Sequence, residues 1–427
     1  MISSHVWLLV LVLVFGVFSF LKGAAKAEQH PVPDKPTADA TAVDKPGIFS
    51  LDDALRHAAD NTSPAQLEAT LLLGDLEPEG ENSSVSMTHV LLQHLRPGRT
   101  GLLKSAAEIS IRKIGAKAIP LLNKSLGSSD RDARAAACTA IHAIGPDAIE
   151  LLPKLIEIMQ SGESFDQRST LYAMQGFDDQ AFDAIEPVAD CLASDDFNVH
   201  CMACRFLEHY GSDALPAEKG LIEILNHGVP SSRGWAAIAL GAIGPTDKND
   251  IVPILIARLT ESRAHVEKQR ILLGLAYLGR EAQRANPTVT EYLNSRTHRV
   301  KPHAAYALYR ITGEPKEMTK ALSKSLGDIN EQHSAFDLIK RLDVEEAIAF
   351  KPKLVELLSA EEEDVREKAV LAIGRLGPAA KDTLPQVKKL LKDPDVFVRE
   401  AAAQTIVSLK FKPPAKEAGV GQGESTK

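Results

Sequence analysis

The chain has 427 residues, of which 44% are hydrophobic and only 5% aromatic, and its 49 basic and 57 acidic residues give a formal net charge of −8. A protein that binds DNA or RNA usually carries a basic surface, so this balance disfavours nucleic acid as a partner. Ala, Leu, Ile and Val supply most of the apolar residues, which favours packed helices over sheets.

The first 27 residues have the features of an export signal. Val6 to Leu21 are apolar or small throughout, and Ala25-Lys26-Ala27 has the small-x-small form of a cleavage site. The basic residues follow the apolar run instead of preceding it, so an uncleaved N-terminal membrane anchor is the alternative. We therefore expect an exported protein, periplasmic or extracellular, that contacts a membrane only through this segment.

Two segments flank a long region of helical pattern. Residues 28–48 are rich in Pro, Asp, Lys, Thr and Ala without apolar periodicity, and residues 412–427 are similar. Both are predicted to be disordered, the first as a linker and the second as a tail. Between them we expect degenerate N-terminal capping repeats over 49–115 and a regular repeat array over 116–411.

A repeat becomes visible from residues that end apolar helices. An apolar residue followed by glycine, or Thr312 followed by Gly313, recurs with glycines at Gly115, Gly145, Gly211, Gly244, Gly279, Gly313 and Gly377. The spacings are 30 to 35 residues or about twice that, with degenerate units at Gly176 and at Leu342-Asp343. Glycine supplies the left-handed φ that a helix C-terminus often needs. This period predicts an all-α, right-handed α-solenoid of about ten or eleven helix pairs.

The repeat units share motifs with a known family. DPDVFVREAAAQTI (393–406) and EEEDVREKAVLAIGRLGP (361–378) resemble the HEAT repeat, particularly the bacterial HEAT-like form first associated with phycobilisome lyases, and 128–146 matches nearly as well. In that family an arginine after the valine bonds an aspartate of the turn and forms a ladder along the rod. The resemblance assigns this structural role to Arg134, Arg366 and Arg399, with Asp393 or Asp395 as the partner of Arg399, while His200 and Lys301 depart from the pattern.

The cysteines raise the question of chemistry. Cys201 and Cys204 lie near Cys191, and three interpretations stay open: buried thiols, a Cys191–Cys204 disulfide that export would permit, or a metal or redox site in the Cys191–Cys204 region. The buried thiols are favoured, because free cysteine commonly behaves as a small buried hydrophobe.

Motifs for catalysis are missing from the sequence. None of the 13 histidines precedes a glutamate, as the metal ligands of a di-iron HEAT hydroxylase would require, and there is no phosphate loop, nucleophile elbow or H-E-x-x-H. We therefore expect no catalytic residue, no metal and no cofactor. A HEAT-type lyase, oxidoreductase or metal protein using the cysteine region is the alternative.

The second helix of each HEAT pair lines the concave side of the solenoid. Its outward positions are expected to carry the partner contacts, because aromatic residues and arginine dominate binding hot spots. The predicted contacts are Arg205, His209, Trp235, Tyr277, Tyr306, Tyr309 and Arg310. A phase error of one residue would instead place the tyrosines in the core. The prediction is a non-enzymatic scaffold or adaptor that binds a protein or peptide on its concave face.

Overall fold

The computed structural model describes residues 50–63, 65–76, 80–99, 101–246, 250–294 and 298–410. Within these ranges the regular elements are α-helices and short 3-10 helices, without a β-strand. None of the described helices is long and apolar enough to cross a bilayer. The predicted leader (1–27), linker (28–48) and tail (412–427) lie outside the described residues.

Consecutive helices pack in pairs, and each pair packs on the next. The first helices of the pairs are α2 (Leu51–Ala59), α4 (Glu81–His94), α6 (Ile119–Leu126), α8 (Leu152–Ser161), α10 (Ile185–Asp190), α12 (Glu218–His227), α14 (Ile251–Glu261), α16 (Asn286–Asn294), α18 (Pro315–Ser325), α21 (Lys351–Leu357) and α23 (Leu384–Lys389). The second helices are α3 (Gln66–Asp75), α5 (Leu102–Ile114), α7 (Arg131–Ile144), α9 (Ser164–Met174), α11 (Phe197–Tyr210), α13 (Pro230–Ile243), α15 (His265–Leu278), α17 (Lys301–Thr312), α19 (Gln332–Ile339), α22 (Glu363–Leu376) and α24 (Val396–Lys410). A short extra helix, α20 (Val344–Ala347), precedes α21.

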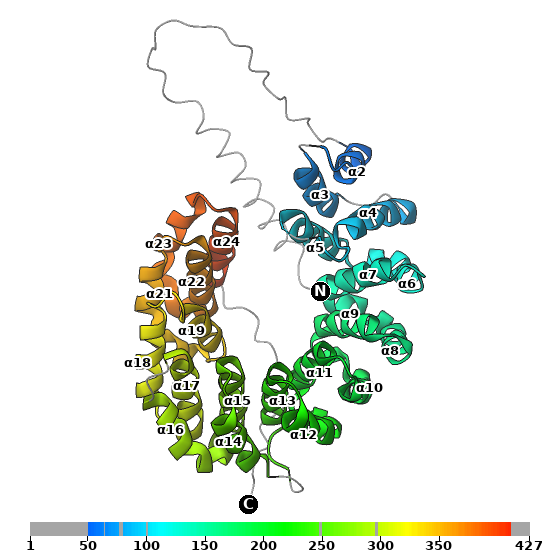
Figure 1. The fold of residues 1–427 in the computed structure, drawn as a ribbon. Helices are drawn as coiled ribbons and strands as arrows, with labels where there is room; N and C mark the ends of the chain where they lie inside the picture. The colour runs from blue at the N-terminus through cyan, green and yellow to red at the C-terminus, as the bar shows by residue number, and fades with distance from the viewer. Residues whose placement is uncertain are drawn as a thin grey trace, which may run out of the picture. The chain divides into compact units, whose positions relative to one another are not determined.

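The second helices contact one another in succession from α3 to α24, and we call them the second-helix layer. Figure 1 shows α11, α13 and α15 following one another in this layer, with α12 and α14 below α13 and α15 in the view. Alanine, leucine and isoleucine from both helices of each pair form one continuous core through the stack. The predicted all-α solenoid is therefore confirmed.

The glycines that end the second helices have positive φ, as the sequence suggested. Only Gly313, with φ 83° and ψ 2°, has the left-handed helical conformation. The other six have ψ between −126°, at Gly211, and −174°, at Gly244. A residue with a Cβ atom rarely adopts positive φ with such negative ψ, so these positions still require glycine. The turn they make is extended in ψ and is not the left-handed helical turn that was expected. In most repeats this turn leads into a short 3-10 helix, such as η7 (Gly211–Ala217), and then into the next first helix.

One repeat makes the same turn without glycine. Asp178 has φ 48° and ψ −130°, and it is the one non-glycine residue with positive φ among those described. Gly176, expected at this place, instead permits close packing, because a Cβ there would lie 2.6 Å from the carbonyl oxygen of His142. The Tyr210 hydroxyl donates to the Asp178 carbonyl (2.8 Å) and accepts from the amide of Ala181 (2.9 Å). Tyr210 therefore holds a strained turn from both sides.

Helices α13 and α15 approach each other more closely than ordinary side chains would allow. A Cβ on Gly241 would lie 2.3 Å from the carbonyl oxygen of Gly274, and a Cβ on Gly274 would lie 2.2 Å from that of Ala237. The two backbones are thus in near-direct contact at this point. Residues on the exposed sides of α11, α13 and α15 are brought together as a result.

Arginines near the starts of second helices link neighbouring repeats. Arg366 donates to two carbonyl oxygens of the turn before its own helix (2.9 and 2.7 Å). It also donates to both carboxylate oxygens of Asp393 in the next repeat (2.8 Å each). This hydrogen bond is the main reason that the pKa of Asp393 lies below its ordinary value. Arg134 binds Asp166 of the following repeat in the same two-pronged way (2.9 and 2.7 Å).

Arg399 differs from the expectation. It donates to the carbonyl oxygens of Asp393 (2.7 Å) and Pro394 (2.8 Å), not to a carboxylate. The Asp393 carboxylate is already bonded to Arg366 of the preceding repeat. Asp395 caps α24 by accepting hydrogen bonds from two backbone amides (2.9 and 3.1 Å). The ladder runs from each arginine to the next repeat, and no described helix follows α24. His200, the departure from the pattern, also contacts its own turn, with Nε2 2.5 Å from the Ser194 carbonyl oxygen.

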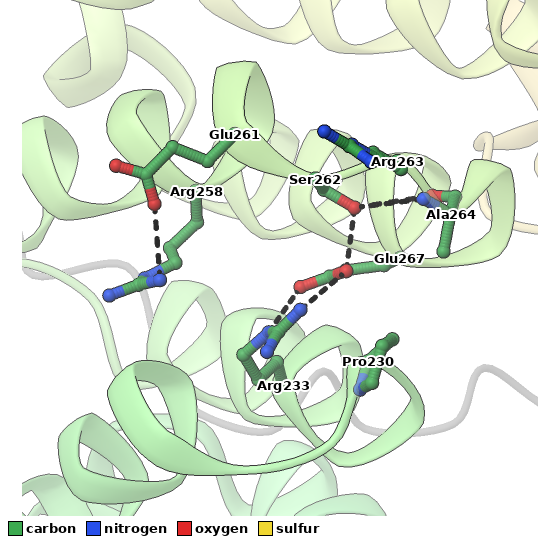
Figure 2. A pocket seen from close by; sticks show the side chains of 8 residues that line it. All are labelled: Pro230, Arg233, Arg258, Glu261, Ser262, Arg263, Ala264 and Glu267. Carbon is green, nitrogen blue, oxygen red and sulfur yellow. Dashed lines mark hydrogen bonds and ion pairs between the residues drawn. The ribbon is translucent and has the colours of Figure 1, made fainter.

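A further ladder contact was not predicted from the sequence. Arg233 on α13 grips Glu267 on α15 (2.5 and 3.0 Å), and Ser262 donates to the same carboxylate (2.6 Å). These groups line a cavity of about 430 Å³, together with Arg258, which donates to Glu261 (3.1 Å). Figure 2 shows how these side chains lie. Glu267 is only 1% exposed. Its charge is satisfied within the cavity, so we assign this cavity a structural role.

Candidate functional site

Three polar side chains from distant parts of the sequence meet on the exposed side of the second-helix layer. The Tyr277 hydroxyl donates to Glu208 (2.8 Å), while Arg341, just after α19, donates to the Tyr277 oxygen (2.7 Å) and to Glu208 (3.4 Å). Glu208 and Arg341 are 133 residues apart in the sequence. The cluster lies where two pockets of about 630 and 200 Å³ adjoin, since Tyr277 and Arg341 line both.

The protonation states in this cluster follow from its packing. Burial, with help from the neighbouring Glu208 carboxylate, raises the pKa of Tyr277 to about 12. Burial alone would lower the pKa of Arg341, but contact with Tyr277 and Glu208 gives a net rise. At neutral pH the tyrosine is therefore a neutral donor between a carboxylate and a guanidinium. A hydrogen-bonded network of this kind helps to fix the side chains that form it.

Beside this cluster, one tryptophan is flanked by two arginines. The guanidinium of Arg205, from α11, lies 5.5 Å from the ring centroid of Trp235 on α13, and that of Arg270, from α15, lies 4.3 Å from it. Gly234 makes room for this arrangement, because a Cβ there would lie 2.8 Å from Cδ of Arg270. Arg270 also donates to the Ser231 carbonyl (3.1 Å). We call Arg205, Trp235 and Arg270 the arginine–tryptophan sandwich.

The two guanidiniums of the sandwich lie close together and have no bonded carboxylate in the part of the chain that the structure describes. Burial lowers the pKa of Arg270, and the nearby charge of Arg205 adds to that effect. Within the described residues neither arginine forms an ion pair with a carboxylate. Two adjacent cations without a bonded anion form a site that favours a carboxylate or another anion.

The remaining predicted contacts are divided between the two pockets. His209 joins Arg205, Trp235 and Tyr277 at the larger one, where its Nε2 lies 2.9 Å from Oδ1 of Asp179. Tyr306 lines the smaller pocket although it is only 6% exposed. Most of its surface packs in the core, so it is not a free partner contact.

Arg310 also lines the smaller pocket, with its Nη1 4.0 Å from Oε1 of Glu346. Tyr309 lines neither pocket and donates to the same Glu346 carboxylate. Burial, together with the hydrogen bond to Glu346, raises the pKa of Tyr309 to about 12. Its hydroxyl therefore stays neutral and bonded at neutral pH.

The sequence did not point to Arg270, Glu208 or Arg341. Arg270 lies two helical turns before Tyr277, so it shares the face of α15 that carries Tyr277, and that spacing could have revealed it. Arg341 lies in a degenerate repeat where the motif gives no alignment. Its contact with Glu208 depends on how closely the intervening helices pack.

The cysteines are free thiols, and the possible Cys191–Cys204 disulfide is not formed in the structure. Burial raises the pKa of Cys191 to about 11, that of Cys138 to about 12, and that of Cys204 well above its ordinary value. Because the thiolate is the reactive form, these three groups are poor nucleophiles at neutral pH. Among the described residues no three His, Cys, Asp or Glu side chains gather closely enough to hold a metal ion.

Comparison with known proteins relates part of the chain to a repeat family. A family model described as HEAT repeats matches residues 351–418. No curated protein matches the chain. Among solved structures, Kap121p bound to Pho4p aligns with a TM-score of 0.52 at 12% identity, over 84% of this chain and 49% of that one. Kap121p bound to Nup53p (TM-score 0.51, 12%, 84% and 49%) and bound to Ste12p (0.52, 12%, 84% and 48%) are similar. The chain thus spans about half the length of these proteins, and the likeness concerns the fold.

Proposed function

We propose that this chain, an all-α solenoid whose residues 351–418 match HEAT repeats, is an exported, non-enzymatic scaffold that binds a protein or peptide partner. The partner would lie along the exposed side of the second-helix layer, at the two adjoining pockets. The solved structures of similar fold contain Kap121p with a bound protein such as Pho4p or Nup53p, which supports this kind of use for the fold.

The observation that carries the proposal is the concentration of binding-type side chains at one place. Trp235, Tyr277, Arg205 and Arg341 line a pocket of about 630 Å³ on a chain in which only 5% of residues are aromatic. Rigid aromatic rings lose little entropy on binding, and aromatic residues and arginine are the residue types most often found at hot spots.

Photo-crosslinking can test where a partner binds. A photoreactive amino acid replaces His209 at the pocket in one variant and His227 on α12, whose side chain is 79% exposed, in a control variant. A partner should crosslink from position 209 and not from 227, and excess wild-type protein should compete while a Trp235→Ala variant competes poorly. Equal crosslinking from both positions, or crosslinking only from 227, would refute binding at this surface.

Export is a separate part of the proposal and needs its own measurement. A chain tagged at its C-terminus is recovered from cell fractions of the source organism, and its N-terminal residue is determined. Cleavage after Ala27 should give a mature chain that begins at Glu28 in the exported fraction. An uncleaved chain in the membrane fraction would support the anchor, and a chain found only in the cytosol would refute export.

A further inference from the structure

The arginine–tryptophan sandwich combines features that are unusual on a single solenoid surface. The chain as a whole carries a net charge of −8, yet here two arginines lie against one indole ring without a carboxylate partner among the described residues. The neighbouring arginine, Arg341, is bonded to Glu208 and Tyr277 and so is already neutralised. The unbalanced positive charge is therefore localised at Arg205 and Arg270.

The side chains of the sandwich are held in position before any ligand arrives. The stem of Arg270 crosses α13 over Gly234, where a Cβ would collide with it, and its Nη1 is bonded to a backbone carbonyl (3.1 Å). Arg205 reaches the same ring from α11, the helix on the other side of α13. An arginine that is ordered in advance loses less entropy when it forms a bidentate bond to a carboxylate.

From this geometry we infer that the sandwich is an anchor for a carboxylate, and that the scaffold's partner presents an acidic, Asp- or Glu-rich extended segment. This inference rests on the proposed function and specifies the chemistry of the partner. A carboxylate of the segment accepts hydrogen bonds from the guanidinium of Arg205 or of Arg270, while the Trp235 ring lies against both guanidiniums. The pocket of about 630 Å³ lined by Arg205 and Trp235 receives the neighbouring residues of the segment.

A nucleic acid strand fits this surface less well. Single-stranded nucleic acid binds through bases that stack on open aromatic faces and through a basic groove that follows the backbone. At the sandwich, guanidiniums from α11 and α15 approach the indole from either side of α13, and the chain is acidic overall. A base that stacked on Trp235 would have to compete with these arginines for the ring.

The tryptophan itself can report on binding. The sequence contains two tryptophans, Trp7 and Trp235, so a Trp7→Phe background leaves Trp235 as the sole emitter. Its fluorescence is titrated with a hexaglutamate peptide, with a hexaglutamine peptide as the uncharged match, and with a hexanucleotide of single-stranded DNA. Hexaglutamate should change the emission saturably and bind more weakly at high salt, because the contact is ionic.

Variants of the two arginines separate a binding role from a structural one. Arg270→Gln and Arg205→Gln should each weaken hexaglutamate binding roughly tenfold or more, as expected for a lost charge-assisted hydrogen bond. Arg270→Lys should fall between wild type and Arg270→Gln, because it keeps the charge and loses the fork. Arg263→Gln, at an exposed arginine of the structural cavity, is the matched control and should bind like wild type. Arg205 is exposed, so its substitution tests the inference even if a change at Arg270 disturbs folding.

The outcomes discriminate between the inference and the function on which it rests. Equal binding of hexaglutamine and hexaglutamate, no loss in Arg205→Gln, or tighter binding of the oligonucleotide would each overturn the acidic-segment anchor. If a partner still crosslinks from position 209 while hexaglutamate fails to bind, the scaffold function stands and only the carboxylate chemistry is wrong.

Discussion

The strained turn at Asp178 gives a prediction with an unusual sign: replacing this residue by glycine should stabilise the protein. Asp178 has φ 48° and ψ −130°, whereas Gly377 makes the corresponding turn of another repeat with φ 56° and ψ −141°. The Asp178 side chain is exposed. Its loss therefore removes little packing, and the backbone dominates the effect.

The magnitude follows from two opposing effects. A non-glycine residue in a sparsely populated backbone region costs about 1–3 kcal/mol, which glycine would release. Glycine also increases the entropy of the unfolded chain, which costs about 0.4–1 kcal/mol. The Asp178→Gly variant should therefore be more stable by about 0.5–2 kcal/mol, with a melting temperature higher by roughly 1–3 °C.

Urea unfolding followed by circular dichroism measures this difference, and two further variants isolate its cause. Asp178→Ala keeps the strain and should stay within about 0.5 kcal/mol of wild type. Gly377→Asp introduces the strain where a new Cβ has room, its nearest neighbour being 3.8 Å away, and should lose about 1–3 kcal/mol. If Asp178→Gly is neutral or destabilising while Gly377→Asp unfolds normally, the strain argument is wrong.

Three further substitutions test packing and charge. Glu267→Gln removes a buried charge opposite Arg233 and should lower the free energy of unfolding by about 2–3 kcal/mol. The loss is smaller than for a fully buried ion pair, because Arg233 keeps some solvent contact. An unchanged urea midpoint would contradict this. Gly241→Ala forces a methyl group towards the backbone of α15 and should lower the free energy of unfolding by about 1–3 kcal/mol, despite the better helix propensity of alanine. Thermal unfolding measures this change, and a stabilised variant would show the close contact to be wrong. Asp393→Asn should destabilise the folded protein at pH 7, because Arg366 lowers the pKa of Asp393 in the folded state. The contribution of this carboxylate to the free energy of unfolding is therefore present above the unfolded pKa of about 3.9. It is lost as the pH falls through the folded pKa. The gap between Asp393→Asn and wild-type melting temperatures should therefore close in acid, and a gap independent of pH would refute the assignment.

The sequence contained most of what was needed for the fold, because each repeat carries its own signal. Glycines at the ends of apolar helices recur at a fixed period, and they reflect a local backbone requirement of the turn that follows. The degenerate repeat was harder: the turn residue proved to be Asp178 and not Gly176, because a strained aspartate can replace glycine when Tyr210 fixes the turn.

The candidate site was only partly predictable for a related reason. Helical phase placed Arg205, Trp235 and Tyr277 on the exposed side of the second-helix layer, where the larger pocket lies. The same reasoning placed Tyr306 there, although it is only 6% exposed, since a difference of one position decides between surface and core. The contact of Glu208 with Arg341 could not be predicted, because it depends on the summed geometry of all the helices between them.

The arginine ladder also determines how the solenoid should respond to mechanical load. Arg134, Arg233 and Arg366 each bond to a carboxylate of the repeat that follows. The Arg233–Glu267 link joins α13 to α15, the helices that carry Trp235 and Arg270. A pull along the chain would break these links one after another, starting at an end. The proposed partner surface on α13 and α15 lies near the middle of the described helices, so it would be among the last parts to unfold. A scaffold under tension would then lose outer repeats before it lost its proposed binding site.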